Sequence, residues 1–551
     1  MKNIKRVLSF ILASVMLMSG CSTTIPEKSE SNSPSSVVNT SPSSVVEEIP
    51  KVDISEKVKL SIYTDNMTNG QFDSNASIKA FDEWAKMCNV EIDWQHPPKD
   101  QKGSNQQLSL TLASKNLPDI IVWNWKSMPG GLARYVEEQI ILPLNEYEDS
   151  MPNYLAAWED NPEVAKCIPL ADGTIPAFYH MNPVPRTITT NGLIIRKDWL
   201  DKLDLPMPST MDDWYTTLKA FKEKDPNGNG LPDEIPFTEA LDGGLGKLDI
   251  FASPFGITLH SYLNIETKKV EYGPANKDAY KEYLMTMNKW YEEGLIDPDY
   301  ATNTPAIRNS NMVNDIAGCT AMFIASGVGK VVPALKENVP TAELIGIATP
   351  AYKDGNSYTI RSERTSKIPH SAIITRSCKN IDRAVYLMDM MYSPEMRDMI
   401  NYGFEGETYD IIDGKKIFKD EILHPADGKT SSEALMPYAC PIAAWPRVVD
   451  YKAQTQIQYS IPEQVTSVKN WEVEKVDLLY DMNIILSAEE SEGVKKLLTE
   501  IKTFAEENSL KFIIGEKSFD EYDKFHEDLM NLDVDKLVSI WQSAYDRYIA
   551  L

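Results

Sequence analysis

The sequence is poor in the residues that metal and redox sites need. It contains six cysteines and six histidines among 551 residues. No two cysteines have the close spacing of a zinc or redox motif, and no two histidines are paired as H-x-x-x-H. The sequence therefore gives no support to a transition-metal catalytic site.

Basic charge is also scarce, and long apolar runs are absent beyond the N-terminus. The chain has 55 Lys and Arg against 81 Asp and Glu, which gives a formal net charge of −26 at pH 7. We expect no nucleic-acid partner, because binding to a phosphate backbone needs a basic surface. No apolar stretch reaches the ~20 residues that a membrane-spanning helix needs.

The N-terminus has the pattern of an export signal. Three basic residues among the first six precede an apolar run of 12 residues, 7–18, which small residues and Cys21 follow. This resembles the lipobox of bacterial lipoproteins, although Met18 stands where leucine is usual. We expect residues 1–20 to be removed and a lipid on Cys21 to hold the protein on the extracellular face of the cell membrane. The alternative is an ordinary signal peptide with an incidental cysteine.

Residues 21–56 are expected to form a disordered tether. The stretch 22–50 is dominated by Ser, Thr, Pro and Glu, and it has too few large apolar groups to offset the entropy of ordering. About 500 residues remain, which is consistent with two or three domains. This body holds an odd number of cysteines, and either a disulfide or buried free thiols suit an exported protein. The cysteines are Cys88, Cys167, Cys319, Cys378 and Cys440.

The body begins with a strand, a helix and a second strand. Residues 58–63 alternate as a half-buried strand does, 75–87 carry an apolar helical face, and the β-branched run at 117–122 is typical of a buried strand. This spacing predicts an α/β layer with right-handed crossovers. Ligands of such sheets bind beyond the carboxyl ends of the strands.

The segment Trp123-Asn124-Trp125 follows the second strand and is therefore expected at a cleft. Two indoles beside an amide suit a sugar, because the C–H faces of the sugar stack on aromatic rings and its hydroxyls need polar partners. The alternative is that one indole belongs to the core and the other covers a helix.

A second α/β block begins at residues 191–200. Ser209 and Asp212 resemble a capping box at the start of an amphipathic helix. Strand-like stretches follow at 344–348 and 370–375, and the second leads into an apolar-periodic helix at 381–391. The C-terminal region is expected to be helical, with two further capping boxes, Ser487 with Glu490 and Ser518 with Glu521.

The loop at 225–234 alternates oxygen-bearing side chains with glycines. Glycine gives the backbone freedom for a curl that points the side chains at one centre. Oxygen ligands alone in a flexible loop indicate calcium rather than zinc or magnesium. The loop is not an EF-hand, because its twelfth position is Pro236, and the alternative is a polar turn without an ion. The expected ligands are Asp225, Asn227, Asn229, the Leu231 carbonyl oxygen, Asp233 and Glu234.

Several motifs occur together in one order along the chain. They are the lipobox, IIRKDWL at 194–200, KDPNGNGLPDEIP at 224–236, NYGFEGETY at 401–409 and WQSAYDRY at 541–548. Over roughly residues 57–551 the chain resembles large extracellular solute-binding lipoproteins of carbohydrate ABC importers, a family that includes alginate-binding proteins and Bacillus-type lipoproteins. The resemblance implies a two-lobed α/β fold of the type II periplasmic-binding-protein kind, with a hinge and extra C-terminal helices.

The resemblance also implies a division of the chain and a set of site residues. The first lobe would take 57–188 and about 367–430, the second 189–366, and 431–551 would supply cleft loops and helices that pack on the lobes. The loop matches the family's calcium site, so its six donors carry over as ligands of a structural Ca²⁺, although Asn229 stands where aspartate is expected. The candidate sugar contacts are Trp123, Asn124, Trp125, Tyr179, Trp445 and Arg447, followed by Tyr63, Glu239 and Arg364.

We therefore expect a binding protein and not an enzyme. It would be a monomer that captures an oligosaccharide between its lobes and delivers it to the membrane subunits of an ABC importer. Trp445 and Arg447 lie in an expected loop, which favours their exposure to the cleft.

Three alternatives remain open. A binder of peptide or another non-sugar solute on the same fold would be separated by a melting-temperature screen. An exported glycoside hydrolase would need two carboxylates ~5–10 Å apart, but no G-x-S-x-G, metal triad or family-like acid motif is present. A surface adhesin stiffened by calcium would show no shift with any small molecule.

Overall fold

The computed structural model describes most of the chain beyond its N-terminal segment. By its internal contacts the chain divides into residues 1–48 and residues 49–551, and every described residue lies in the second unit. The described residues are 52–68, 70–114, 116–125, 128–161, 168–170, 172–181, 191–240, 248–352, 360–362, 370–440, 445–471, 477–480, 484 and 486–550. Cys21, Cys167 and Arg364 lie outside them, as does most of the expected tether.

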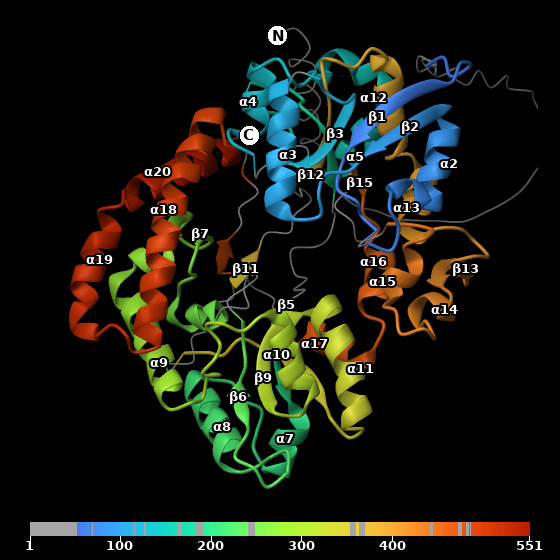
Figure 1. Ribbon diagram of the computed structural model, residues 1–551. Coiled ribbons are helices and arrows are strands. Elements are labelled where there is room, and N and C mark those ends of the chain that lie inside the picture. Colours follow the sequence, from blue (N-terminus) through green and yellow to red (C-terminus); the bar gives the residue numbers. More distant parts are fainter. Residues whose placement is uncertain are drawn as a thin grey trace, which may run out of the picture. The chain divides into compact units, whose positions relative to one another are not determined.

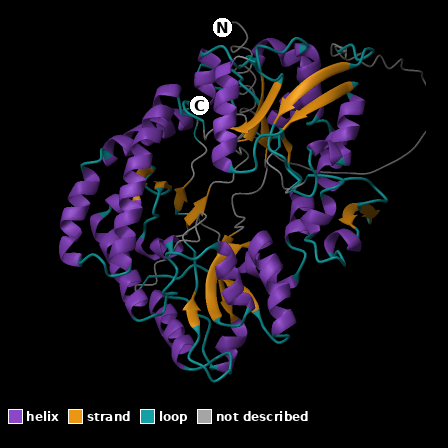
Figure 2. Ribbon diagram, viewed as in Figure 1, coloured by secondary structure: helices purple, strands orange, loops and turns teal. Residues whose placement is uncertain are grey.

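A six-stranded sheet forms the first α/β layer (Figures 1 and 2). β1 runs parallel to both β2 and β3, as the strand–helix–strand spacing predicts. β12 pairs antiparallel with both β3 and β4, and β15 pairs parallel with β4. In spatial order the strands are β15 (Arg447–Val448), β4 (Phe178–Met181), β12 (His370–Ile374), β3 (Ile120–Asn124), β1 (Val58–Tyr63) and β2 (Val90–Gln95).

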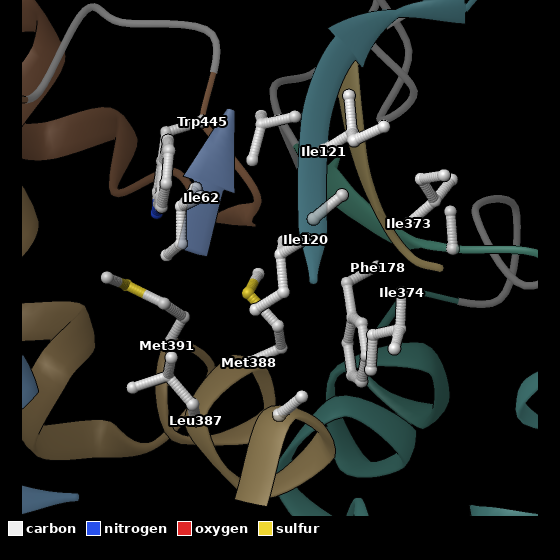
Figure 3. Close-up of a cluster of buried hydrophobic side chains, with 14 of the residues drawn as sticks. Ile62, Ile120, Ile121, Phe178, Ile373, Ile374, Leu387, Met388, Met391 and Trp445 are labelled. Atoms are coloured by element: carbon white, nitrogen blue, oxygen red, sulfur yellow. The ribbon is translucent and has the colours of Figure 1, made fainter. Parts of the chain in front are cut away.

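The core of this layer forms because successive strand residues point to opposite faces. Ile120 and Ile374 point toward Leu387 and Met388 of α12 (Ile381–Met390), whereas Ile121 points the other way (Figure 3). All five side chains are fully buried. Further helices of this layer are α2 (Lys79–Met87), α3 (Gln101–Ser114), α4 (Gly131–Glu137), α5 (Pro152–Glu159) and α13 (Pro394–Tyr402).

A four-stranded mixed sheet forms the second layer, in the order β10 (Leu344–Ile347), β5 (Asn191–Arg196), β9 (Ala317–Phe323) and β6 (Ile235–Phe237). Each face has its own core: Leu193 and Ile195 pack in one apolar cluster, and Ile194 between them packs in another. The first cluster includes α7 (Lys197–Lys202), α8 (Met211–Glu223) and α9 (Lys277–Glu292), and the second α10 (Pro305–Val313), α11 (Gly329–Asn338) and α17 (Pro462–Trp471).

The remaining elements extend these two layers. A small sheet contains β11 (Ile360–Ser362), β16 (Leu478–Tyr480), β7 (Ser261–Asn264) and β8 (Lys269–Tyr272). The C-terminal helices α18 (Ala488–Ile513), α19 (Tyr522–Met530) and α20 (Val534–Ile549) belong to the larger core of the second layer. A hairpin of β13 (Tyr409–Ile412) and β14 (Lys415–Phe418) shares a separate small core with α14 (Asp420–Leu423), α15 (Ser431–Leu435) and α16 (Tyr451–Gln458).

One expected helix cap is wrong by a single residue. Thr210, not Ser209, is the N-cap of α8, and it forms a capping box with Asp213 instead of Asp212. Thr210 is held in an extended conformation by a bridge to Ala351, so the first helical turn starts one residue later. The boxes at Ser487 and Ser518 are confirmed.

The cysteines and the helices settle two further points for the part of the chain that is described. Cys88, Cys319, Cys378 and Cys440 are buried free thiols, which is one of the two states that the sequence allowed. None of the described helices has both the length and the apolar character needed to cross a bilayer.

Candidate functional site

Strand ends converge along one edge of the six-stranded sheet. β1 and β3 are parallel, so their last residues, Tyr63 and Asn124, lie at the same edge. β12 runs the opposite way and places His370 beside Asn124, and β15 places Arg447 beside His180 of β4. The sheet thus gathers five of the predicted sugar contacts on strands that reach this edge: Tyr63, Trp123, Asn124, Tyr179 and Arg447.

Tyr63 and Trp123 form an aromatic pair at this edge, with ring centroids 5.9 Å apart. Both rings are buried, at 4% and 2% exposure. The Tyr63 hydroxyl and the Trp123 Nε1 are also buried, and neither has a hydrogen-bond partner among the described residues. Burial, with a smaller contribution from the Asp65 charge, raises the pKa of Tyr63 to about 12, so the hydroxyl keeps its proton and can donate it in a hydrogen bond.

Trp125 has the character of a core residue. It is 1% exposed, its Nε1 donates to the Ser371 carbonyl oxygen at 3.1 Å, and its ring meets Tyr135 of α4 edge-on at 5.4 Å. Tyr179 is buried as well, and its carbonyl oxygen accepts a bond from the Tyr392 hydroxyl. Trp125 therefore agrees with the second interpretation of the sequence, in which one of the two tryptophans belongs to the core and does not contact a sugar.

The expected exposure of Trp445 and Arg447 is wrong. Trp445 is fully buried and packs on Phe81, with ring centroids 4.9 Å apart. Arg447 is also fully buried, its Nη1 donates to the Cys440 carbonyl oxygen, and burial lowers its pKa to about 10. The reason is that Arg447 begins an edge strand of the sheet, where a free loop was expected. A ligand-binding role for either residue stays a prediction.

Glu239 follows β6 and is fully buried. Its carboxylate accepts bonds from Arg308 Nη1 at 3.0 Å and from the backbone N–H groups of Ala240 and Ala321. Burial raises its pKa to about 8, although Arg308 acts in the opposite direction. These bonds fix the ends of β6 and β9 together, which gives Glu239 a structural task besides the predicted ligand contact.

Phe323 is an exposed aromatic residue that the sequence reasoning missed. It ends β9, its side chain is 44% exposed, and it is the only aromatic among the exposed large apolar residues that the structure describes. A π-helical turn, Ile324–Val328, follows it directly, and such turns are frequent at functional sites. The signal in the sequence was a buried small-residue strand that ends in a bulky ring.

The loop at 225–234 curls as expected, and Gly228 and Gly230 take the positive φ angles that the curl needs. The Asp225 carboxylate accepts bonds from the N–H groups of both glycines. The Asn229 amide donates to both Asp233 oxygens at 3.1 Å. The Asn229 and Asp233 side chains therefore lie beside each other, and the Asp225 carboxylate holds the curled backbone.

The donors of this loop fit a calcium ion by chemistry. Glu234 Oε1 is buried without a hydrogen-bond partner in the described part of the chain. Burial, and then the charges of Asp225 and Asp233, raise the pKa of Glu234, which is the environment that a bound cation would relieve. No group of three His, Cys, Asp or Glu side chains suited to a metal is found among the described residues, so the three carboxylates of the loop do not form such a group, and the calcium site stays a prediction.

Residues 73–398 match the family model for the bacterial extracellular solute-binding protein. This chain is a bacterial extracellular solute-binding protein. Among curated relatives, the fructooligosaccharide ABC transporter substrate-binding protein FusA of Streptococcus pneumoniae serotype 4 is 23% identical over 499 residues, which are 84% of this chain and 86% of FusA. Lipoprotein LipO of Bacillus subtilis strain 168 is 27% identical over 349 residues, 62% of this chain and 65% of LipO.

Solved structures of other solute-binding proteins have the same fold. The alginate-binding protein AlgQ2, crystallised without calcium ion, is 25% identical, with a TM-score of 0.69 over 89% of this chain and 98% of AlgQ2. FusA in complex with kestose gives a TM-score of 0.72 at 20% identity, over 89% of this chain and 99% of FusA. The expected two-lobed α/β fold is confirmed, and we refer to the six-stranded layer as the first lobe and the four-stranded layer as the second lobe.

Proposed function

We propose that this solute-binding protein captures an oligosaccharide outside the cell and delivers it to an ABC importer. The observation that carries the proposal is the relationship to FusA, a named fructooligosaccharide-binding protein, along 84% of the chain. The importer is the partner because FusA is named as the substrate-binding protein of an ABC transporter. The named ligands of the relatives include a neutral saccharide and alginate, so the relatives leave open whether this ligand carries charge.

The two sheets suggest how the ligand is held. Tyr63 and Trp123 stand at the ligand-facing edge of the first lobe, and the exposed ring of Phe323 stands at the carboxyl end of β9 in the second. Aromatic faces cover the C–H surfaces of a sugar, and polar atoms at the strand ends bond its hydroxyls. The ligand stabilises the closed state of the lobes, and the importer recognises that state.

The proposal describes binding without chemistry. The relatives are named as binding proteins, and the acidic residue placed deepest at a strand end, Glu239, is held by Arg308 and two backbone N–H groups instead of facing open space. We therefore expect the protein to release its ligand chemically intact.

Calcium and a lipid anchor complete the proposal. The calcium loop lies between α8 and β6, so the ion would stiffen the second lobe without touching the ligand. When bound, the ion would supply positive charge to the carboxylates of the loop. LipO, a relative, is named as a lipoprotein, which agrees with lipidation of Cys21. We expect a monomer held at the extracellular membrane face.

A substitution of Phe323 tests the site. Phe323→Ala should weaken binding of an oligosaccharide ligand by about 1–3 kcal/mol, as for other aromatic anchors at binding sites. Isothermal titration calorimetry measures the change, and sugar analysis of the same mixture should show intact ligand. Ile307→Ala, an exposed apolar residue of the same lobe, is the matched control. Release of shorter sugars, or ligands found only among peptides, would contradict the proposal.

A further inference from the structure

A cavity of about 660 Å³ opens at the carboxyl ends of β1 and β2. One side is lined by the last residues of the two strands, Tyr63 and Gln95, and by the segment that follows β2, His96 to Pro98. Its position beyond the strand ends, and a volume within the usual range for ligand sites, are those of a binding pocket.

The opposite wall comes from one face of α3. Gln107, Thr111 and Ser114 follow one another at intervals of four and three residues, so their side chains share a helix face. Asn116, just beyond the helix, extends this wall. The wall therefore offers amides and hydroxyls, which both donate and accept hydrogen bonds.

His96 uses both ring nitrogens in hydrogen bonds to the backbone. Its Nε2 lies 3.4 Å from the Asn75 backbone N–H, and its Nδ1 lies 2.8 Å from the Thr64 carbonyl oxygen. The described lining of the cavity contains no Asp, Glu, Lys or Arg side chain.

An acidic residue lies close in sequence to this lining. Asp65 follows Tyr63 by two residues, is exposed, and its charge contributes to the raised pKa of Tyr63. A carboxylate on a ligand in this cavity would meet repulsion from Asp65 and find no Lys or Arg in the described lining to offset it. A neutral sugar meets no such cost, and its hydroxyls match the amides and hydroxyls of the wall.

We propose that this cavity is a subsite for a neutral sugar unit and that it excludes uronic acids. Tyr63 lines the cavity, and its hydroxyl is buried without a hydrogen-bond partner among the described residues. The two prolines give apolar surface for the C–H face of the sugar. The inference rests on the proposed function, because it specifies the charge of the oligosaccharide that the protein captures.

The first experiment is a melting-temperature screen of the full-length protein with short neutral oligosaccharides and short oligouronates in equal number. We expect at least one neutral saccharide, and no uronate, to raise the melting temperature. A uronate that binds as tightly as the best neutral ligand would overturn the subsite while leaving the proposed function in place. No shift with any saccharide would overturn both.

The second experiment compares two neighbouring glutamines by calorimetry with the neutral ligand found. Gln107→Ala removes an amide from the cavity wall and should weaken binding about fivefold, the worth of one neutral hydrogen bond. Gln106→Ala, exposed on α3 and outside the lining, should leave affinity unchanged. Tyr63→Phe, which keeps the ring, should weaken binding by a similar factor. Full affinity in both Gln107→Ala and Tyr63→Phe would refute the subsite.

Discussion

At the scale of single residues, the strand ends of the first lobe that we propose to face the ligand carry buried polar atoms without a hydrogen-bond partner among the described residues. A buried polar group without a partner costs about 1–3 kcal/mol, and such costs persist where a group serves a ligand. Tyr63 and Trp123 both have such an atom among the described residues, whereas the neighbouring Trp125 spends its N–H on Ser371. This contrast favours Trp123 over Trp125 as a ligand contact, and that role stays a prediction.

The first prediction concerns the cost of the Tyr63 hydroxyl. Tyr63→Phe should stabilise the ligand-free protein by about 1 kcal/mol, because it removes an unsatisfied group without opening a cavity. Urea unfolding of the ligand-free protein measures the change. Tyr154→Phe is the matched control: its hydroxyl donates to Ala177 at 2.8 Å in the same lobe, so the substitution should destabilise. Equal effects of the two substitutions would show that the Tyr63 hydroxyl is satisfied.

The second prediction concerns the calcium loop. After chelator treatment, added Ca²⁺ should raise the melting temperature of the protein. At a Ca²⁺ concentration 100 times the dissociation constant, the free energy of unfolding should increase by about 2.7 kcal/mol. Mg²⁺ should not replace Ca²⁺. Asp233→Asn removes a charge from the centre of the loop and should abolish most of the shift. Glu223→Gln, on the last turn of α8 just before the loop, should keep it. A shift that persists in Asp233→Asn would place the ion elsewhere.

At the scale of elements, helix ends in this protein are capped from other helices as well as from their own sequence. Asp389 of α12 accepts bonds from the Tyr154 N–H at 2.8 Å and the Asn153 amide at 2.6 Å, both in the first turn of α5. The carboxylate thus caps a helix more than 200 residues away in sequence. Burial nonetheless raises the pKa of Asp389 to about 6.

The third prediction follows from that pKa. The unfolded chain loses the Asp389 proton near pH 4, but the folded protein keeps it up to about pH 6, so this residue lowers stability as pH rises between these values and has no further effect above them. Asp389→Asn should remove about 2 kcal/mol of this decline. Urea unfolding at pH 4, 5, 6 and 7 measures it. Asp382→Asn, exposed on the first turn of α12, is the control; if it changes the slope equally, Asp389 is not the cause.

At the scale of the whole molecule, the chain combines an acidic body with an N-terminal segment that we predict to attach it to the membrane. The net charge of −26 makes an anionic membrane surface repel the body. A covalent lipid at Cys21 would keep the protein near the importer in spite of this repulsion, while the Ser/Pro-rich segment after it would leave the orientation of the lobes free.

The fourth prediction tests this attachment. Cys21→Ser should move the protein from the membrane fraction to the medium, with saccharide binding unchanged, because the binding lobes are remote in sequence from residue 21. Fractionation and labelling with a radioactive fatty acid measure the two consequences. Cys88→Ser, at a buried free thiol, is the control for loss of a thiol. A Cys21→Ser protein that stays on the membrane would refute lipid anchoring at this residue.

Features that depend on residues close together in the chain could be predicted from the sequence. The strand at 58–63, the helix at 381–390 and the capping boxes at Ser487 and Ser518 lie where their patterns predict. Alternation, helical period and caps are local, so they can be followed along the chain. The family, and with it the two-lobed fold, was also predicted from motifs in their order.

The exposure of individual aromatic and charged residues could not be predicted and became visible in the folded protein. Trp445 and Arg447 were expected in a loop. Arg447 instead begins the edge strand β15, and Trp445 lies just before this strand. β15 pairs with β4, which lies more than 250 residues earlier in the chain. Phe323 is exposed although it ends an interior strand, and the cavity beside Tyr63 is formed where residues of α3 face the ends of two strands. The burial of a side chain depends on contacts with residues far away in the chain, and these contacts cannot be inferred from a short stretch of sequence.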